Sequence, residues 1–371
     1  MKKQRIVVKI GSSSLTNTTG EIDEKKLSDH VQAIANLRQA GHEVILVSSG
    51  SVAAGFSKLG YATRPVTIKG KQAAAAVGQS LLIQTYSEKF QAYDIVPAQI
   101  LLTRSDFSDR DRYRNAFQTL NELLERNILP IINENDTVSI DELTFGDNDM
   151  LSALVSGFMH ADQLIILTDI NGIYDKNPFV YKDAKKYNEI HHISDEMIAQ
   201  FDESRSSVGT GGMKSKLLAA QIALSLGVPT FVGSGQGKHK LLEILKREGD
   251  GTYIDNHSMA SLNTKKQWLK FHSESVGKLY VDHGAEEAII LNGKSLLPPG
   301  IFRVKGEFSK GDVVEVYGVH GLLGKGEVNY SSDELKQLMK AREELVSEER
   351  SPMVEVIHRN RWVELQNHRR S

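Results

Sequence analysis

Two glycine-containing segments that carry lysines, far apart in the chain, have the composition of a phosphate-binding site. VKIGSSS places Lys9 in an apolar run, shortly before a glycine and three serines. VGTGGMKSK places three glycines before Lys214 and Lys216. Glycine lets an anion approach backbone N–H groups closely, and lysine supplies a positive charge for phosphate. Taken alone, Lys9 could equally be a strand-end lysine that points to solvent.

The second lysine pair lies at the start of a predicted helix. In VGTGGMKSKLLAAQIAL (208–224) the glycines precede a helical pattern, so both lysines fall in its first turn. The helix dipole disfavours positive charge at that end, and a lysine pair there needs an anion. The residue order differs from the Walker A motif, GxxxxGK[ST]. A flexible linker is the other interpretation, and the dipole argument favours phosphate binding over it.

Asparagine and aspartate gather in two further segments. NEND (133–136) follows a predicted strand, and FGDNDMLSALV (145–155) opens a predicted helix. Such side chains are costly to bury unless they bind something. Amides recognise an ammonium and a carboxylate together, and carboxylates hold lysines or Mg²⁺. Loops that only cap helices are the alternative, and two of them after parallel strands are less common.

Two more predicted strand ends carry hydroxyl groups. The turn Ser48-Ser49-Gly50 begins a short predicted helix and could donate to a carboxylate or a phosphate, although an ordinary N-cap is a common alternative. Thr168 and Asp169 follow the run DQLIIL, where the ribose or phosphates of a nucleotide could lie.

The elements that must position these residues alternate along the first two thirds of the chain. Predicted helices cover 23–41 and 71–93, and they separate runs that are apolar throughout. Strands of this kind indicate a mainly parallel sheet covered by helices on both faces, an α/β/α sandwich whose ligands bind at the carboxyl ends of the strands. The apolar runs are 5–10, 43–48, 95–102, 127–132, 162–168 and 228–233.

The pattern changes after about residue 265. Short apolar segments alternate with glycine and proline turns such as Pro298-Pro299-Gly300, which indicates a small, mostly β module. One helix over 331–346 and a closing strand over 353–365 complete it. We expect a catalytic domain over 1–262, a linker over 263–275 and the β module over 276–365.

Composition excludes several functional classes. A chain of 371 residues is long enough for two domains, and a net charge of −2 does not indicate a nucleic-acid or membrane partner. The absence of cysteine removes disulfides, thiolate nucleophiles and cysteine metal sites. The apolar run after the N-terminal lysines is too short for a signal peptide, so we expect a cytoplasmic protein. Phosphoryl transfer fits the remaining features, because it needs positioned cations and little covalent chemistry from the protein.

The motifs resemble those of a known family. VKIGSS, VSSGSVAAG, NENDTV, FGDNDMLSALV, LTDINGIY and GTGGMKSK, in this order and spacing, are similar to the glutamate 5-kinases of the amino acid kinase superfamily. The resemblance covers nearly the whole chain, and the C-terminal module resembles a PUA domain. It implies phosphorylation of the γ-carboxylate of L-glutamate by ATP, the first step of proline synthesis, with Mg²⁺ carried by ATP.

The resemblance also implies roles for individual residues. Lys9 holds the transferred phosphoryl oxygens, Lys216 stabilises charge on the nucleotide side, and Asp149 orients both lysines by ion pairing. Glutamate is bound by Ser49, Asp136 and Asn148, with Asp136 facing the α-ammonium group. The implied ATP-binding residues are Lys9, Thr168, Asp169, Thr210, Gly211, Gly212, Met213, Lys214, Ser215 and Lys216.

Two other functions compete with this reading. One is a kinase of another small carboxylic acid, such as N-acetylglutamate; the other is a regulatory RNA-binding protein on a kinase fold. RNA affinity depends largely on neutralising phosphates, and residues 276–332 hold six basic and seven acidic residues, so RNA is not the expected partner. The family suggests homo-oligomers, dimers or tetramers, and glutamate-5-semialdehyde dehydrogenase as a partner.

Overall fold

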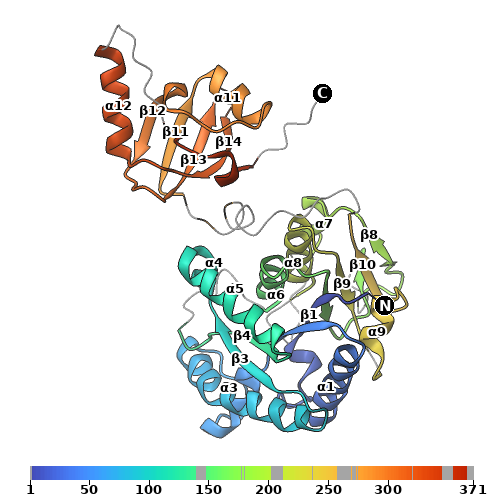
Figure 1. Cartoon of the computed structure of the whole chain (residues 1–371). Helices are drawn as coiled ribbons and strands as arrows, with labels where there is room; N and C mark the ends of the chain where they lie inside the picture. Colours follow the sequence, from blue (N-terminus) through green and yellow to red (C-terminus); the bar gives the residue numbers. More distant parts are fainter. Residues whose placement is uncertain are drawn as a thin grey trace. The chain divides into compact units, whose positions relative to one another are not determined.

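The computed structural model divides the chain into two compact units (Figure 1). One contains Met1–Asp106 and Arg114–Ser261, and the other contains Phe107–Tyr113 and Leu262–Ser371. The expected linker over 263–275 lies mostly outside the described residues, and the expected domain boundaries stay a prediction. The structure describes residues 2–138, 148–176, 178, 180–201, 212–235, 237–256, 269, 273, 275–319, 321–344 and 354–365.

An eight-stranded sheet forms the centre of the larger unit, in the order β3-β4-β2-β1-β5-β9-β10-β8. Its strands pair in parallel except for β9 with β10, so the predicted mainly parallel sheet is confirmed. The strands are β1 Arg5–Ile10, β2 Glu43–Ser48, β3 Pro97–Leu102, β4 Leu129–Glu134, β5 Gln163–Leu167, β8 Glu189–Ile190, β9 Thr230–Gly233 and β10 Gly251–Ile254. A two-stranded ribbon adds β6 Ile173–Tyr174 and β7 Lys186–Tyr187.

Helices cover both faces of this sheet, with α1 and α3 on one face and α6 and α8 on the other (Figure 1). The helices described in this part of the chain are α1 Glu24–Gln39, α2 Ser51–Gly55, α3 Ile68–Gln91, α4 Arg104–Ser108, α5 Arg110–Glu125, α6 Asn148–Phe158, α7 Asp195–Ala199, α8 Met213–Ser225 and α9 Lys240–Leu245. The end of α4 and the start of α5 belong to the segment Phe107–Tyr113, which is assigned to the other unit. The short 3₁₀ turns Ser12–Ser14 (η1) and Ser57–Leu59 (η2) follow β1 and α2. None of the helices in the described part of the chain has the length and apolar composition of a membrane span.

Strand alternation decides which face of the sheet each β1 side chain meets. Ile6, Val8 and Ile10 pack in the apolar cluster to which α1 contributes its buried face. Lys9 therefore points to the opposite face, where α6 and α8 lie. The helix α1 starts where the Asp23 side chain accepts hydrogen bonds from two backbone N–H groups of its first turn, as an N-cap residue does.

The smaller unit is built on a five-stranded sheet in the order β12-β11-β13-β14-β15. Two expectations need correction here. The segment His283–Ile290 is a helix, α11, capped by Asp282, where only strands were expected. The closing strand expected over 353–365 is reduced to β15 Trp362–Glu364, because Arg359–Arg361 forms a 3₁₀ turn before it. The remaining elements are β11 Gly277–Val281, the 3₁₀ turn η4 Pro298–Gly300, β12 Ile301–Gly306, β13 Val313–Gly318, β14 Gly321–Glu327 and α12 Ser332–Glu344.

Candidate active site

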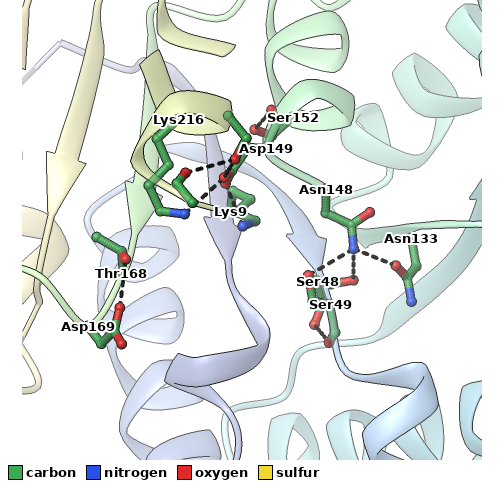
Figure 2. Close-up of polar contacts among 12 residues, drawn as sticks. Lys9, Ser48, Ser49, Asn133, Asn148, Asp149, Ser152, Thr168, Asp169 and Lys216 are labelled. Carbon is green, nitrogen blue, oxygen red and sulfur yellow. Dashed lines mark hydrogen bonds and ion pairs between the residues drawn. The ribbon is translucent and has the colours of Figure 1, made fainter. Parts of the chain in front are cut away.

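Three charged side chains meet in the interior at the carboxyl end of β1. Lys9 Nζ lies 2.5 Å from Asp149 Oδ1, and Lys216 Nζ lies 3.0 Å from Asp149 Oδ2 (Figure 2). The exposed fraction is 1% for Lys9, 0% for Asp149 and 7% for Lys216. A single carboxylate therefore separates two ammonium groups, one at each oxygen. The cluster carries a net charge of +1, which suits a phosphate group.

The local sequence explains why these side chains converge. Asp149 lies in the first turn of α6, where the helix dipole favours a negative charge. Lys216 lies near the start of α8, and the Ser215 hydroxyl of the same turn donates to Asp149 Oδ2 at 3.0 Å. The carboxylate thus supplies at least part of the negative charge that the lysines at the start of α8 require. Gly11 adds room beside the cluster, because a Cβ there would lie 3.3 Å from Lys9 Nζ.

A network of neutral groups lies next to this charged cluster (Figure 2). Asn148 Nδ2 donates to Ser49 Oγ and to Asn133 Oδ1, both at 2.9 Å. Asn133 Nδ2 in turn donates to Gln79 Oε1 at 2.7 Å. Asn148 Oδ1 is buried and has no hydrogen-bond partner among the described residues. An unsatisfied buried acceptor costs about 1–3 kcal/mol, which a ligand donor would offset.

Asp136 lies apart from that network and is held by another residue. Ser51 Oγ donates to Asp136 Oδ2 at 2.7 Å. Burial raises the pKa of Asp136, while the Ser51 hydrogen bond and the positive charge of Arg64 act in the opposite direction. The carboxylate is therefore fixed in place but incompletely compensated.

The position of Ser51 depends on close packing between α2 and α3. A Cβ on Gly55 would lie 2.0 Å from the carbonyl oxygen of Ala74, and one on Gly78 would lie 1.8 Å from that of Ser51. Such distances exclude any side chain at these two glycines, so the backbones of the helices touch. Gly50, with φ of 114°, makes the left-handed turn that begins α2. This packing places the hydroxyl-rich turn beside the end of β4.

The residues expected to bind ATP are only partly described. Thr168 Oγ1 donates to Asp169 Oδ1 at 3.0 Å, and Figure 2 shows this pair on the other side of Lys9 from Asn148. The segment 212–216 begins α8, with Gly212 as its N-cap and Met213, Lys214 and Ser215 half-buried. Thr210 and Gly211 lie outside the described residues.

The structure thus groups the expected catalytic and glutamate-binding residues in three places. Lys9, Asp149 and Lys216 form the charged cluster, Ser49 and Asn148 belong to the neutral network, and Asp136 stands with Ser51. Sequence reasoning did not single out Asn133, Gln79 or Ser51. The segments NEND and VSSGSVAAG contain Asn133 and Ser51, but no local pattern in the sequence indicates the distant residues with which they form hydrogen bonds.

The donor set of the site is better suited to phosphate and carboxylate oxygens than to a metal ion. Both oxygens of Asp149 already meet lysines, and the neighbouring groups are amides and hydroxyls. Within the described ranges, no group of three or more histidine, aspartate or glutamate side chains could hold a metal ion.

Family comparisons agree with this geometry. The amino acid kinase family matches residues 4–234, and the PUA domain matches residues 277–348. The chain belongs to the amino acid kinase family, so the resemblance read from the motifs is confirmed. The solved structure of a carbamate kinase from Giardia lamblia bound to AMP-PNP shares the fold, with a TM-score of 0.50 and 17% identity over 69% of this chain and 99% of that one.

Curated relatives are much closer in sequence. Glutamate 5-kinase 1 of Bacillus licheniformis is 61% identical over 98% of this chain and 100% of its own length. Glutamate 5-kinase 1 of Bacillus subtilis is 59% identical over 99% of this chain and 100% of its own. Glutamate 5-kinase of Oceanobacillus iheyensis is 58% identical over 98% and 97%, respectively.

Proposed function

We propose that this chain is a glutamate 5-kinase, which transfers the γ-phosphoryl group of ATP to the γ-carboxylate of L-glutamate. Relatives of that name match it over nearly its full length. The observation that supports the reaction best is the pair of lysines held on opposite oxygens of Asp149. In the transfer, a carboxylate oxygen bonds to the γ-phosphorus, the bond from that phosphorus to the β–γ bridging oxygen breaks, and ADP leaves.

Phosphoryl transfer to a carboxylate requires fixed positive charges and no general base. A glutamate side chain has an ordinary pKa of about 4.3, so the attacking carboxylate is already ionised at neutral pH. Two anions must approach in line, and preorganised cations lower that barrier. We assign Lys9 to the transferred phosphoryl oxygens and Lys216 to the nucleotide side. Asp149 sets the distance between the two ammonium groups and prevents either from turning away.

The acceptor is bound next to the transfer cluster. Ser49, Asn148 and Asp136 are assigned to glutamate, with the Asp136 carboxylate opposite the α-ammonium group. The buried Asn148 Oδ1, which lacks a partner among the described residues, supports a ligand donor at this place. Thr168, Asp169 and the segment 210–216 are assigned to ATP, whose phosphates would lie at the N-terminal end of α8.

We further propose that Mg²⁺ enters as the ATP complex and neutralises phosphate charge, without firm protein ligands. The product, an acyl phosphate, is labile, which favours transfer to glutamate-5-semialdehyde dehydrogenase as the next enzyme. We place the protein in the cytoplasm, as a homodimer or homotetramer. RNA is not among the expected partners.

A hydroxylamine trap tests this function directly. Purified protein, MgATP and L-glutamate should yield γ-glutamyl hydroxamate, and N-acetylglutamate should yield none. Hydroxamate from N-acetylglutamate in place of L-glutamate would establish the sister activity instead. Folded protein that forms no hydroxamate from either acid would contradict the kinase assignment.

A further inference from the structure

Arg64 is a half-buried cation close to the acceptor side of the site. It lies in the connection between η2 and α3, and the next residue, Pro65, is buried. The arginine stem runs along Gly20, where a Cβ would lie 3.6 Å from Arg64 Cδ and 3.7 Å from Cγ. A Cβ at this position would be in ordinary van der Waals contact with the stem, so the arginine packs directly on the turn at Gly20.

The guanidinium group has no partner of its own in the described part of the chain. No residue described there forms a hydrogen bond or an ion pair with it, although it offers five N–H donors. Burial lowers the pKa of Arg64, and the negative charge of Asp136 partly restores it. A cation in this setting gains most from an anionic ligand, because carboxylate and guanidinium form two parallel hydrogen bonds.

Arg64 and Asp136 influence each other without touching. Each alters the pKa of the other, yet the two form no ion pair within 4.0 Å. Asp136 instead accepts a hydrogen bond from the Ser51 hydroxyl. The Arg64 stem packs on Gly20. Two residues further on, Ile22 Cδ1 lies 3.3 Å from the Cβ position of Gly50, next to Ser51, so the arginine lies near the Ser51–Asp136 pair. A carboxylate held by Ser51 and a nearby guanidinium without a partner among the described residues match the two charges of an α-amino acid head group.

We propose that Arg64 binds the α-carboxylate of the acceptor while Asp136 binds its α-ammonium group. This inference deepens the proposed glutamate kinase function and rests on it. The γ-carboxylate has to lie beside the lysine cluster, so the α-carboxylate is the charge of glutamate that remains to be matched. The arginine makes the site selective for acids that carry a free α-carboxylate.

The test compares L-glutamate with 4-aminobutyrate, which keeps the amino group and the reacting carboxylate but lacks the α-carboxylate. Arg64→Gln removes the charge and keeps the part of the stem that lies on Gly20. Its KM for L-glutamate should rise about 10- to 100-fold, as expected for loss of a charged hydrogen bond, with KM for ATP within about twofold. The inhibition constant of 4-aminobutyrate against L-glutamate should stay within about twofold.

Two control variants and a stability measurement distinguish a binding role of Arg64 from a structural one. Lys58→Gln removes an exposed positive charge from the adjoining turn η2 and should leave all constants unchanged. Arg64→Lys keeps the charge without the planar fork and should give an intermediate KM. Thermal unfolding should give the same midpoint for all variants.

An unchanged KM for L-glutamate in Arg64→Gln would overturn the inference, as would an equal loss of affinity for both ligands. If Arg64→Gln unfolds at lower temperature, the Arg64→Lys variant decides: an unchanged KM with stability restored would assign the arginine to the fold. Wild-type protein that forms no hydroxamate from L-glutamate would defeat the proposed function before any variant is compared.

Discussion

Two aspartates lie at the site, and their surroundings differ in how completely their charge is compensated. Asp149 is fully buried, and each of its oxygens meets a lysine ammonium. Asp136 is half-buried and accepts one hydrogen bond from Ser51. The positive charge of Arg64 lowers its pKa without forming an ion pair with it. The protein itself compensates the charge of Asp149, which holds the two lysines in place, whereas the charge of Asp136 is incompletely compensated and is available to a ligand.

The start of α6 joins these two kinds of chemistry. Asn148 and Asp149 are consecutive, yet Asn148 bonds to Ser49 and Asn133 while Asp149 bonds to the lysines. In the proposed reaction, one turn of helix would therefore position both the acceptor and the transferred phosphoryl group. A shift of that turn would disturb both at once, which suits a reaction that depends on alignment.

Replacing Asp149 by Asn should have the largest effect on the molecule. Two buried lysines would lose their counter-charge, and removing one partner of a buried ion cluster costs about 3–5 kcal/mol of unfolding free energy. Activity should fall roughly 10³-fold because the cations are no longer fixed. Urea unfolding should be followed by circular dichroism, because both tryptophans, Trp268 and Trp362, lie in the C-terminal part.

The matched control is Asp94→Asn, at an exposed aspartate with φ of 54°, a backbone conformation that Asn tolerates. It should unfold like the wild type. Wild-type stability in the Asp149→Asn variant would show that the lysines do not need this carboxylate.

Replacing Lys216 by Ala separates catalysis from stability on the same cluster. Asp149 remains paired with Lys9, so the fold should persist. The turnover number should fall about 10²- to 10³-fold, the usual loss when one preorganised charge is removed from the reacting group. Initial rates of hydroxamate formation measure it, with Lys58→Ala as the exposed control. Turnover near that of the wild type would remove Lys216 from the assigned role.

The sequence predicts this cluster better than the acceptor side, and the reason is physical. The β1 run, the buried face of α1 and the starts of α6 and α8 are local patterns that the chain displays within a few residues. Asn133 to Gln79 and Ser51 to Asp136 join residues 54 and 85 positions apart. They depend on the backbone contact of Gly55 and Gly78, and no local pattern reports such a contact.

The missed helix α11 teaches the opposite lesson. Its N-cap, Asp282, is a local signal that could have identified it, because aspartate before a short apolar run favours a helix start. The glycine and proline turns on either side indicated a β module and outweighed this signal. The closing strand was overestimated for a related reason, since an apolar run alone does not show how many of its residues find a partner strand.

Replacing Asp136 by Asn should give the opposite stability result to Asp149→Asn. The raised pKa of Asp136 means that the folded state holds its proton more tightly than the unfolded chain. Its contribution to stability is present below the ordinary aspartate pKa of about 3.9 and is lost as pH rises through the raised value. At neutral pH the variant should therefore unfold at the same temperature as the wild type or higher.

The cost of that substitution should appear in binding. KM for L-glutamate should rise about 10- to 100-fold at neutral pH, because the ammonium loses its charged partner. Melting curves for both proteins at several pH values should converge in acid. A clear loss of stability at neutral pH would show that Asp136 is compensated by the protein after all.

Replacing Ser51 by Ala should have the smallest effect and tests how Asp136 is kept ionised. The Ser51 hydroxyl donates to Asp136 and lowers the pKa of that carboxyl against the effect of burial. Without it, the pKa of Asp136 rises further, and the acid limb of kcat/KM for L-glutamate should move to higher pH. Near neutral pH, kcat/KM should fall about 3- to 10-fold.

Ser80→Ala, at an exposed serine of α3, is the control. An unchanged pH profile would mean that Arg64 and the substrate ammonium group, rather than Ser51, keep Asp136 ionised at the working pH. Comparing Ser51→Ala with the double variant that also carries Arg64→Gln would then separate the contribution of Arg64 from that of the substrate.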